Sequence, residues 1–119
     1  MRKENDLSKR LFDFAVQVIT YQRTLARTTE YDVIKYQLTK SSTSAGANYE
    51  ESQGASSKAD FSNKVFISLK EMRESNYWLR IIKAINQNKS AELDILIKES
   101  EELKNILGSI TTKTRAKLR

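Results

Sequence analysis

The sequence predicts an all-α protein, specifically an up-down-up-down antiparallel four-helix bundle. Three observations predict this fold. The 119 residues include no Pro and only three Gly, so little interrupts long helices. Apolar residues recur at spacings of three and four in four segments, and short polar connections join those segments. A chain of this length is the size of one domain, and we expect residues 1–119 to form a single bundle.

The first helix is predicted over about residues 7–27. One face recurs at helical spacing and consists of Leu7, Leu11, Phe14, Val18, Gln22 and Leu25. Phe12, Ala15, Val16 and Ile19 widen that face beyond what one neighbouring helix requires. We therefore expect this helix to contact more than one neighbour.

The second helix is predicted over about residues 31–53, after a break at Thr28–Glu30. Its inward face begins with the apolar Ile34 and Leu38. It then becomes small or polar where a usual bundle has leucine, at Ser41, Ala45, Asn48 and Ser52. The run Ser41–Ser44 has poor helix propensity, so tertiary packing must keep it helical. Because these side chains are small, we expect the partner helix to approach closely.

The third helix is predicted over about residues 58–86, with Ser56 or Ser57 as its N-cap. One face carries Phe61, Val65, Ser68, Met72, Ser75, Leu79 and Ile82. A second face beside it carries Lys64, Ile67, Glu71, Glu74, Trp78, Ile81 and Ile85. The second face predicts a further packing surface, on a neighbouring helix or on another subunit.

The fourth helix is predicted over about residues 91–114, with Ser90 as its N-cap. Leu93, Leu96, Ser100, Leu103, Leu107 and Ile110 keep a seven-residue period along it. We expect its last turns to fray into the basic tail that ends at Arg119.

Six residues of the second and third helices are interpreted as a structural polar core that fixes helix register: Asn48, Glu51, Lys64, Glu71, Glu74 and Trp78. The carboxylates Glu51, Glu71 and Glu74 also raise the alternative of a di-metal centre. Bundles of that kind use Glu-x-x-His motifs, and the chain has no His. We therefore expect no metal and no cofactor, and expect Trp78 to pack rather than to stack on a ligand.

The composition disfavours catalysis. The absence of both Cys and His removes thiolate nucleophiles, imidazole bases and the commonest metal ligands. No phosphate-binding loop or catalytic triad motif is present. The charged amino terminus lacks a secretory signal, and no apolar run approaches a membrane span. We expect a cytoplasmic protein that is not an enzyme.

The net charge of +6 favours acidic partners such as RNA or DNA. Two groups of residues are candidates for nucleic-acid contact: Lys70, Arg73, Tyr77 and Arg80 on the third helix, and Lys113, Arg115, Lys117 and Arg119 in the tail. The alternative interpretation is a solvated basic face whose ion pairs contribute little.

A succession of residues resembles one known family. It runs through Gln37, Leu38, Ser41, Ser44, Asn48, Tyr49, Glu50, Glu51, Ser57, Asp60, Phe61, Lys64, Ser68, Glu71, Glu74, Trp78 and Leu79. The chain resembles the four-helix-bundle proteins encoded in intervening sequences of bacterial large-subunit ribosomal RNA genes. Ser68 and Ser52 depart from the family, which often has alanine and a small apolar residue there.

The resemblance implies a helical subunit of a ring-like homopentamer. A related bundle is the accessory protein of diversity-generating retroelements, a basic pentamer that partners a reverse transcriptase and binds nucleic acid. We therefore expect a self-assembling, non-enzymatic bundle with a basic surface for RNA or DNA. The alternative is a structural or adaptor protein that binds another protein and has no nucleic-acid role.

Overall fold

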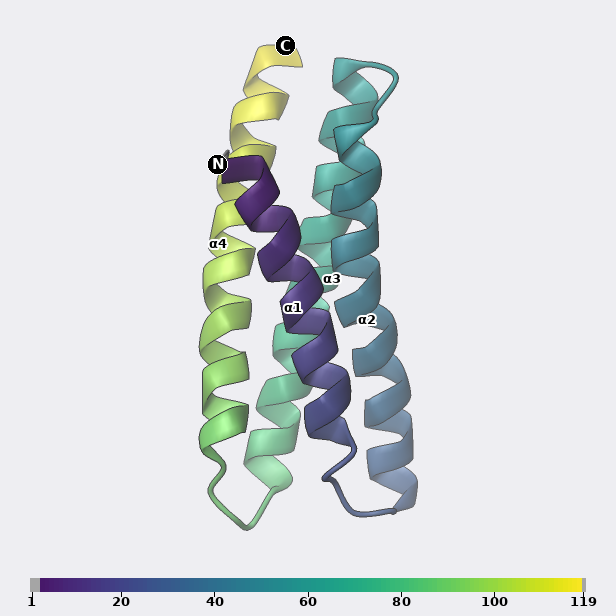
Figure 1. The fold of residues 1–119 in the computed structure, drawn as a ribbon, viewed down its shortest axis with the longest axis vertical. Helices are drawn as coiled ribbons and strands as arrows, with labels where there is room; N and C mark the ends of the chain where they lie inside the picture. Colours follow the sequence, from purple (N-terminus) through teal and green to yellow (C-terminus); the bar gives the residue numbers. More distant parts are fainter. Residues whose placement is uncertain (1–2, 119) are drawn as a thin grey trace.

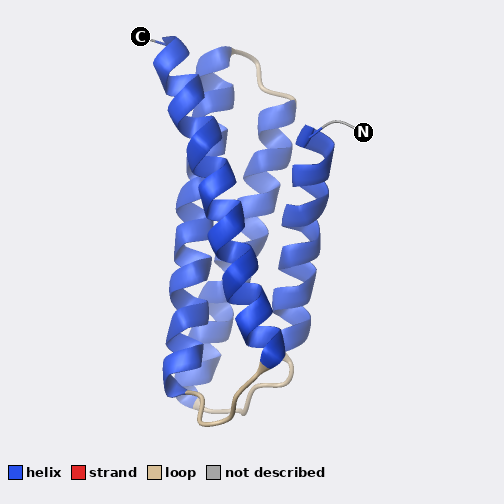
Figure 2. Ribbon diagram, turned by 90° about the vertical axis from the view of Figure 1, so that its left-hand side faces the viewer, coloured by secondary structure: helices blue, strands red, loops and turns tan. Residues whose placement is uncertain are grey.

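The computed structural model describes residues 3–118, and four helices make up nearly all of this range (Figure 1). They are α1 (Lys3–Gln22), α2 (Thr29–Gln53), α3 (Lys58–Ile85) and α4 (Ala91–Leu118). They alternate in direction, with the α1–α2 and α3–α4 turns at one end and the α2–α3 turn at the other (Figure 2). The predicted all-α antiparallel bundle is confirmed.

Each helix packs against the two helices beside it. α2 packs on α3, α3 packs on α4, and α1 closes the bundle between α2 and α4. At 20 residues α1 is the shortest helix, and both α4 and the α2–α3 turn extend beyond its first turn (Figure 1). No helix in the described range has the length and apolar character that crossing a membrane requires.

The core follows the predicted helical faces. Leu11, Phe14 and Val18 of α1 are almost fully buried, as the spacing of that helix predicts. The other helices contribute Leu38, Ala45, Tyr49, Val65, Met72, Leu79, Ile82, Leu103 and Leu107, each at most 1% exposed.

Three side chains fix where helices begin. The Thr28 hydroxyl accepts a hydrogen bond from the Tyr31 amide at 3.1 Å, so Thr28 is the N-cap of α2. The predicted start near residue 31 was therefore too late, because Thr28 belongs to the helix end and not to the connection. The predicted caps Ser57 and Ser90 are confirmed: their hydroxyls accept from the amides of Asp60 at 3.0 Å and Leu93 at 3.2 Å.

The predicted bounds of α1 and α4 need correction. α1 begins at Lys3 and ends at Gln22, five residues before the predicted end, because the chain enters a turn there. The Thr24 hydroxyl and amide both donate to the Tyr21 carbonyl within that turn. α4 does not fray after residue 114 but continues to Leu118.

α2 and α3 approach closely through small residues. The Ser41 and Ser75 hydroxyl oxygens are 2.8 Å apart, and both side chains are fully buried. The Ser68 hydroxyl donates to the Ala45 carbonyl at 2.7 Å. A leucine at any of these positions would hold the two backbones apart, which is why the serines of both helices face one another.

Candidate nucleic-acid interface

The residues interpreted as a polar core lie along the rim between α2 and α3. Asn48, Lys64, Glu71 and Trp78 are half-buried, whereas Glu51 and Glu74 are exposed. For these two glutamates the core interpretation is corrected, because burying a carboxylate is costly and the rim leaves it solvated. The groups that are fully buried are the serine hydroxyls, which bond to each other or to backbone carbonyls.

One polar contact on this rim joins α2 to α3, and another lies within α3. Glu51 pairs with Lys64 at 3.2 Å, and the Trp78 indole N–H donates to a Glu74 carboxylate oxygen at 3.2 Å. Burial raises the pKa of Glu71, and the neighbouring Glu74 carboxylate raises it further. Among the described residues no group of three or more acidic side chains could hold a metal ion.

A groove of about 460 Å³ between α3 and α4 is lined by positively charged side chains. Arg73 lines it from α3, and Lys104 and Arg115 line it from α4. The remaining lining residues are uncharged: Phe66, Leu69, Asn105, Gly108, Thr111 and Thr112. The groove is therefore lined by three cations and by no carboxylate.

One end of the groove is built on Phe66. The guanidinium carbon of Arg115 lies 4.0 Å from the centroid of the Phe66 ring, and the Lys70 ammonium lies 5.7 Å from it. A hydrogen bond from the Thr114 hydroxyl to the Ser62 hydroxyl, 3.3 Å long, joins α4 to α3 nearby. These contacts explain why the tail predicted to fray is helical, since cation–π attraction and this bond hold it on α3.

The other end adjoins a polar network. Lys104 forms an ion pair with Glu101 at 2.9 Å, and that contact is the main cause that lowers the pKa of Glu101. The Asn76 amide donates to Glu101 and to Ser100, each at 2.9 Å. Arg73 has no ion pair with any described residue. Arg73 is therefore the cation at this end whose charge no carboxylate offsets.

Of the predicted nucleic-acid contacts, the structure brings Lys70, Arg73 and Arg115 together around this groove. Tyr77 and Arg80 lie further along α3, where the guanidinium is 5.8 Å from the Tyr77 ring and donates to Asn76. Lys113 and Lys117 are exposed on the last turns of α4 and do not line the groove. Arg119 lies outside the described residues.

Sequence reasoning missed several residues of the groove. Phe66 and Lys104 were not singled out, and neither was Gly108. A signal was present: positions 104, 108, 112 and 115 recur at spacings of four, four and three on one face of α4. Recognising that face as a groove wall requires knowing that it lies opposite Phe66 and Arg73.

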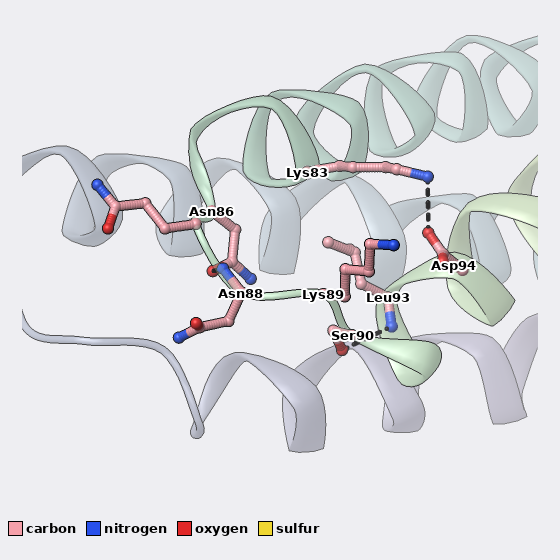
Figure 3. Close-up of a pocket in the computed structure, with 8 residues that line it drawn as sticks. Lys83, Asn86, Asn88, Lys89, Ser90, Leu93 and Asp94 are labelled. Atoms are coloured by element: carbon pink, nitrogen blue, oxygen red, sulfur yellow. Dashed lines mark hydrogen bonds and ion pairs between the residues drawn. The ribbon is translucent and has the colours of Figure 1, made fainter.

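A second hollow lies at the α3–α4 turn and offers weaker grounds for a site (Figure 3). Lys83 pairs with Asp94 across it at 2.8 Å, and Ser90 caps α4 at its base. These contacts hold the turn in place. Asp94 neutralises Lys83, so Lys89 is the one lining lysine without an ion pair to a described residue. With fewer lining cations and a lining carboxylate, the hollow attracts anions less than the α3–α4 groove does.

The third hollow is apolar and lies between α1 and α2. Its apolar residues are Leu11, Phe12, Ala15, Val16, Ile19, Gly46 and Ala47. Phe12 is 68% exposed and Val16 is 47% exposed. This surface is the wide apolar face of the first helix that the sequence predicted, and α2 covers only part of it.

Comparison with known proteins places these features in a family. The family model described as 23S rRNA-intervening sequence protein matches residues 3–109. A similar crystal structure is that of a protein of unknown function from the S23 ribosomal protein family of Bacteroides thetaiotaomicron VPI-5482. It is 32% identical, with a TM-score of 0.82, over 93% of this chain and 99% of that one. No curated protein shows significant similarity to the chain.

Proposed function

Because this chain belongs to the 23S rRNA-intervening sequence protein family, as its resemblance predicted, we propose that it is a non-enzymatic bundle that self-assembles and binds RNA or DNA in the cytoplasm. The observation that carries the nucleic-acid part is the α3–α4 groove, with three lining cations and no lining carboxylate. Lys70 adds a fourth positive charge at its edge. Lysine and arginine contacts of this kind supply most sequence-independent affinity for phosphate.

Self-assembly is supported by two apolar surfaces on the single chain. One is the α1–α2 groove with its exposed Phe12 and Val16. The other is the second face of α3, where Ile67, Trp78 and Ile81 are half-buried and Ile85 is 46% exposed. Because the two surfaces consist of different residues, contact between them in successive copies is heterologous, and such contacts form a ring when the rotation between copies closes.

A ring of identical copies presents several α3–α4 grooves on one particle. We take five copies as the number, because that is the assembly the family resemblance implies. Each copy then presents one α3–α4 groove, and a nucleic acid that reaches several grooves binds with higher avidity than any groove alone provides. Binding in this mechanism is electrostatic, and it weakens as salt concentration rises.

The nucleic-acid role is tested by titrating the full chain into fluorescently labelled RNA and DNA over a series of salt concentrations. We expect affinity to fall linearly on a log–log plot against salt, with a smaller slope for Arg73→Ala. Arg27→Ala is the matched control, because Arg27 is an exposed arginine in the α1–α2 connection. Absence of binding at about 50 mM salt would refute the proposal.

The assembly is tested separately by light scattering. The expected mass is near five times the 13.7 kDa of one chain. A mass of one chain refutes self-assembly and favours the alternative function, an adaptor whose α1–α2 groove takes another protein. A monomer that still binds nucleic acid favours the nucleic-acid role, and a monomer that does not bind it favours the adaptor.

A further inference from the structure

Gly108 is the residue that keeps the α3–α4 groove open. It lies within the 28-residue helix α4, where glycine costs about 1 kcal/mol relative to alanine. Packing does not require it: a Cβ at this position would meet only the Leu69 Cδ1 methyl group, at 4.0 Å, which is ordinary contact. Its φ is not positive, so backbone conformation does not require glycine either. Because Gly108 lines the groove and has no side chain, the groove has more space at this position.

Arg115 provides a flat surface at one end of that space. Its guanidinium lies over the Phe66 ring at 4.0 Å, a distance at which the two planar groups stack. One guanidinium face is then covered by the ring, and the opposite face is available to a second flat group. Nucleic-acid bases stack on guanidinium planes in this way.

Arg73 provides a phosphate contact at the other end. It lies seven residues after Phe66 on α3, which is two helical turns or about 10 Å along the axis. It is exposed and has no ion pair with a described residue, whereas the nearby Lys104 is partly neutralised by Glu101. The stacking surface and the phosphate contact therefore lie at opposite ends of the groove, along the direction of the helices.

Resting on the nucleic-acid role proposed above, we propose that the α3–α4 groove accepts single-stranded nucleic acid. An unpaired base stacks on Arg115, and a backbone phosphate contacts Arg73. Duplex bases are stacked on one another and cannot reach a guanidinium face, and a duplex is too broad to enter the space between two packed helices. Arg115 also lies beyond residues 3–109, the part matched by the family model, so this feature depends on the final turns of α4.

The test compares affinity for a labelled single-stranded uridine homopolymer with affinity for a duplex of equal length at one low salt concentration. We expect the single strand to bind more tightly. Gly108→Leu fills the groove without changing charge and should weaken single-strand binding about tenfold or more, since stacking of one base contributes about 1–3 kcal/mol. Arg115→Lys keeps the charge, removes the plane and should weaken single-strand binding more than duplex binding.

Ser109→Leu is the matched control for Gly108→Leu, because it adds the same side chain at the next, exposed position outside the groove lining. Circular dichroism establishes that each variant is as helical as the parent chain. Equal affinity for single strand and duplex, or equal effects of the two leucine variants, overturns the groove inference while leaving nucleic-acid binding intact. Failure to bind either nucleic acid overturns the proposed function with it.

Discussion

The hydroxyl oxygens of Ser41 and Ser75 are 2.8 Å apart across the α2–α3 interface, and neither side chain is exposed to solvent. Each hydroxyl has one proton to donate. One serine donates across the contact, and the other donates to a carbonyl of its own helix, at Leu38 for Ser41 or at Glu71 for Ser75. The contact therefore joins α2 to α3 through buried side chains, and it leaves neither of these two hydroxyls without a partner.

Enlarging Ser41 should cost more stability than removing its hydroxyl. We expect Ser41→Leu to lower the free energy of unfolding by about 1–3 kcal/mol, because the added carbons must force α2 from α3. Ser41→Ala should cost about 1 kcal/mol. Urea unfolding measures both, with the exposed Ser109→Leu as control for adding a leucine to a helix. Equal losses for Ser41→Leu and Ser109→Leu would contradict close packing at Ser41.

Glu71 makes stability depend on pH. Its pKa is raised by burial and by Glu74, so between the ordinary glutamate pKa and the raised value the folded chain binds more protons than the unfolded chain. The contribution of Glu71 to the free energy of unfolding therefore falls as pH rises through that range. We expect Glu71→Gln to be more stable than the parent at about pH 7, and the difference to shrink near pH 4.

Urea unfolding at those two pH values tests the prediction for Glu71. The exposed Glu50→Gln controls for loss of one negative charge from the chain. A Glu71→Gln variant that is less stable than the parent at neutral pH would show that the carboxylate is favourable in its charged form.

Thr28 should contribute measurably to stability as the N-cap of α2. Its hydroxyl accepts from the Tyr31 amide, which otherwise lacks a partner at the start of α2. We expect Thr28→Ala to lower the free energy of unfolding by about 1 kcal/mol. The matched variant Thr29→Ala, at the exposed next position, should change it much less. Thermal unfolding of both variants distinguishes the cap from a general effect of losing a threonine.

Phe12 should control assembly more than folding. It is 68% exposed on α1, so Phe12→Glu removes little core packing but places a charge in the α1–α2 groove. We expect this variant to have the mass of a single chain by light scattering and to remain helical. Gln17→Glu introduces the same charged side chain at an exposed position of α1 outside the groove and should assemble like the parent. Unchanged mass for Phe12→Glu would exclude this groove as the contact between copies.

Local sequence was sufficient for the helices and their inward faces. Leu11, Phe14 and Val18 are buried as their spacing predicts, and the small residues of α2 and α3 meet one another as predicted. Periodicity identifies a face because burial repeats with the helical turn. It also identified the family, since the order of polar residues through Trp78 is specific to that fold.

What the sequence could not predict depends on contacts between helices. The last turns of α4 lack the regular core spacing, and their helical form is explained by contacts with Phe66 and Ser62 of α3. The groove combines residues about 40 positions apart, and periodicity does not say which outward faces adjoin. The exposure of Glu51 and Glu74 was missed because both residues lie beside the inward faces of their helices, at positions where the rim meets solvent.

The short α1 is held only between α2 and α4, while its outer side carries Phe12 and Val16. A short helix with an exposed apolar side opens more readily than the longer helices of the same bundle, so the amide protons of α1 should exchange with solvent before those of α2 and α3. Covering that side with another copy of the chain would protect the same amides. The order of α1 would then rise with protein concentration, and folding and association would become one linked equilibrium.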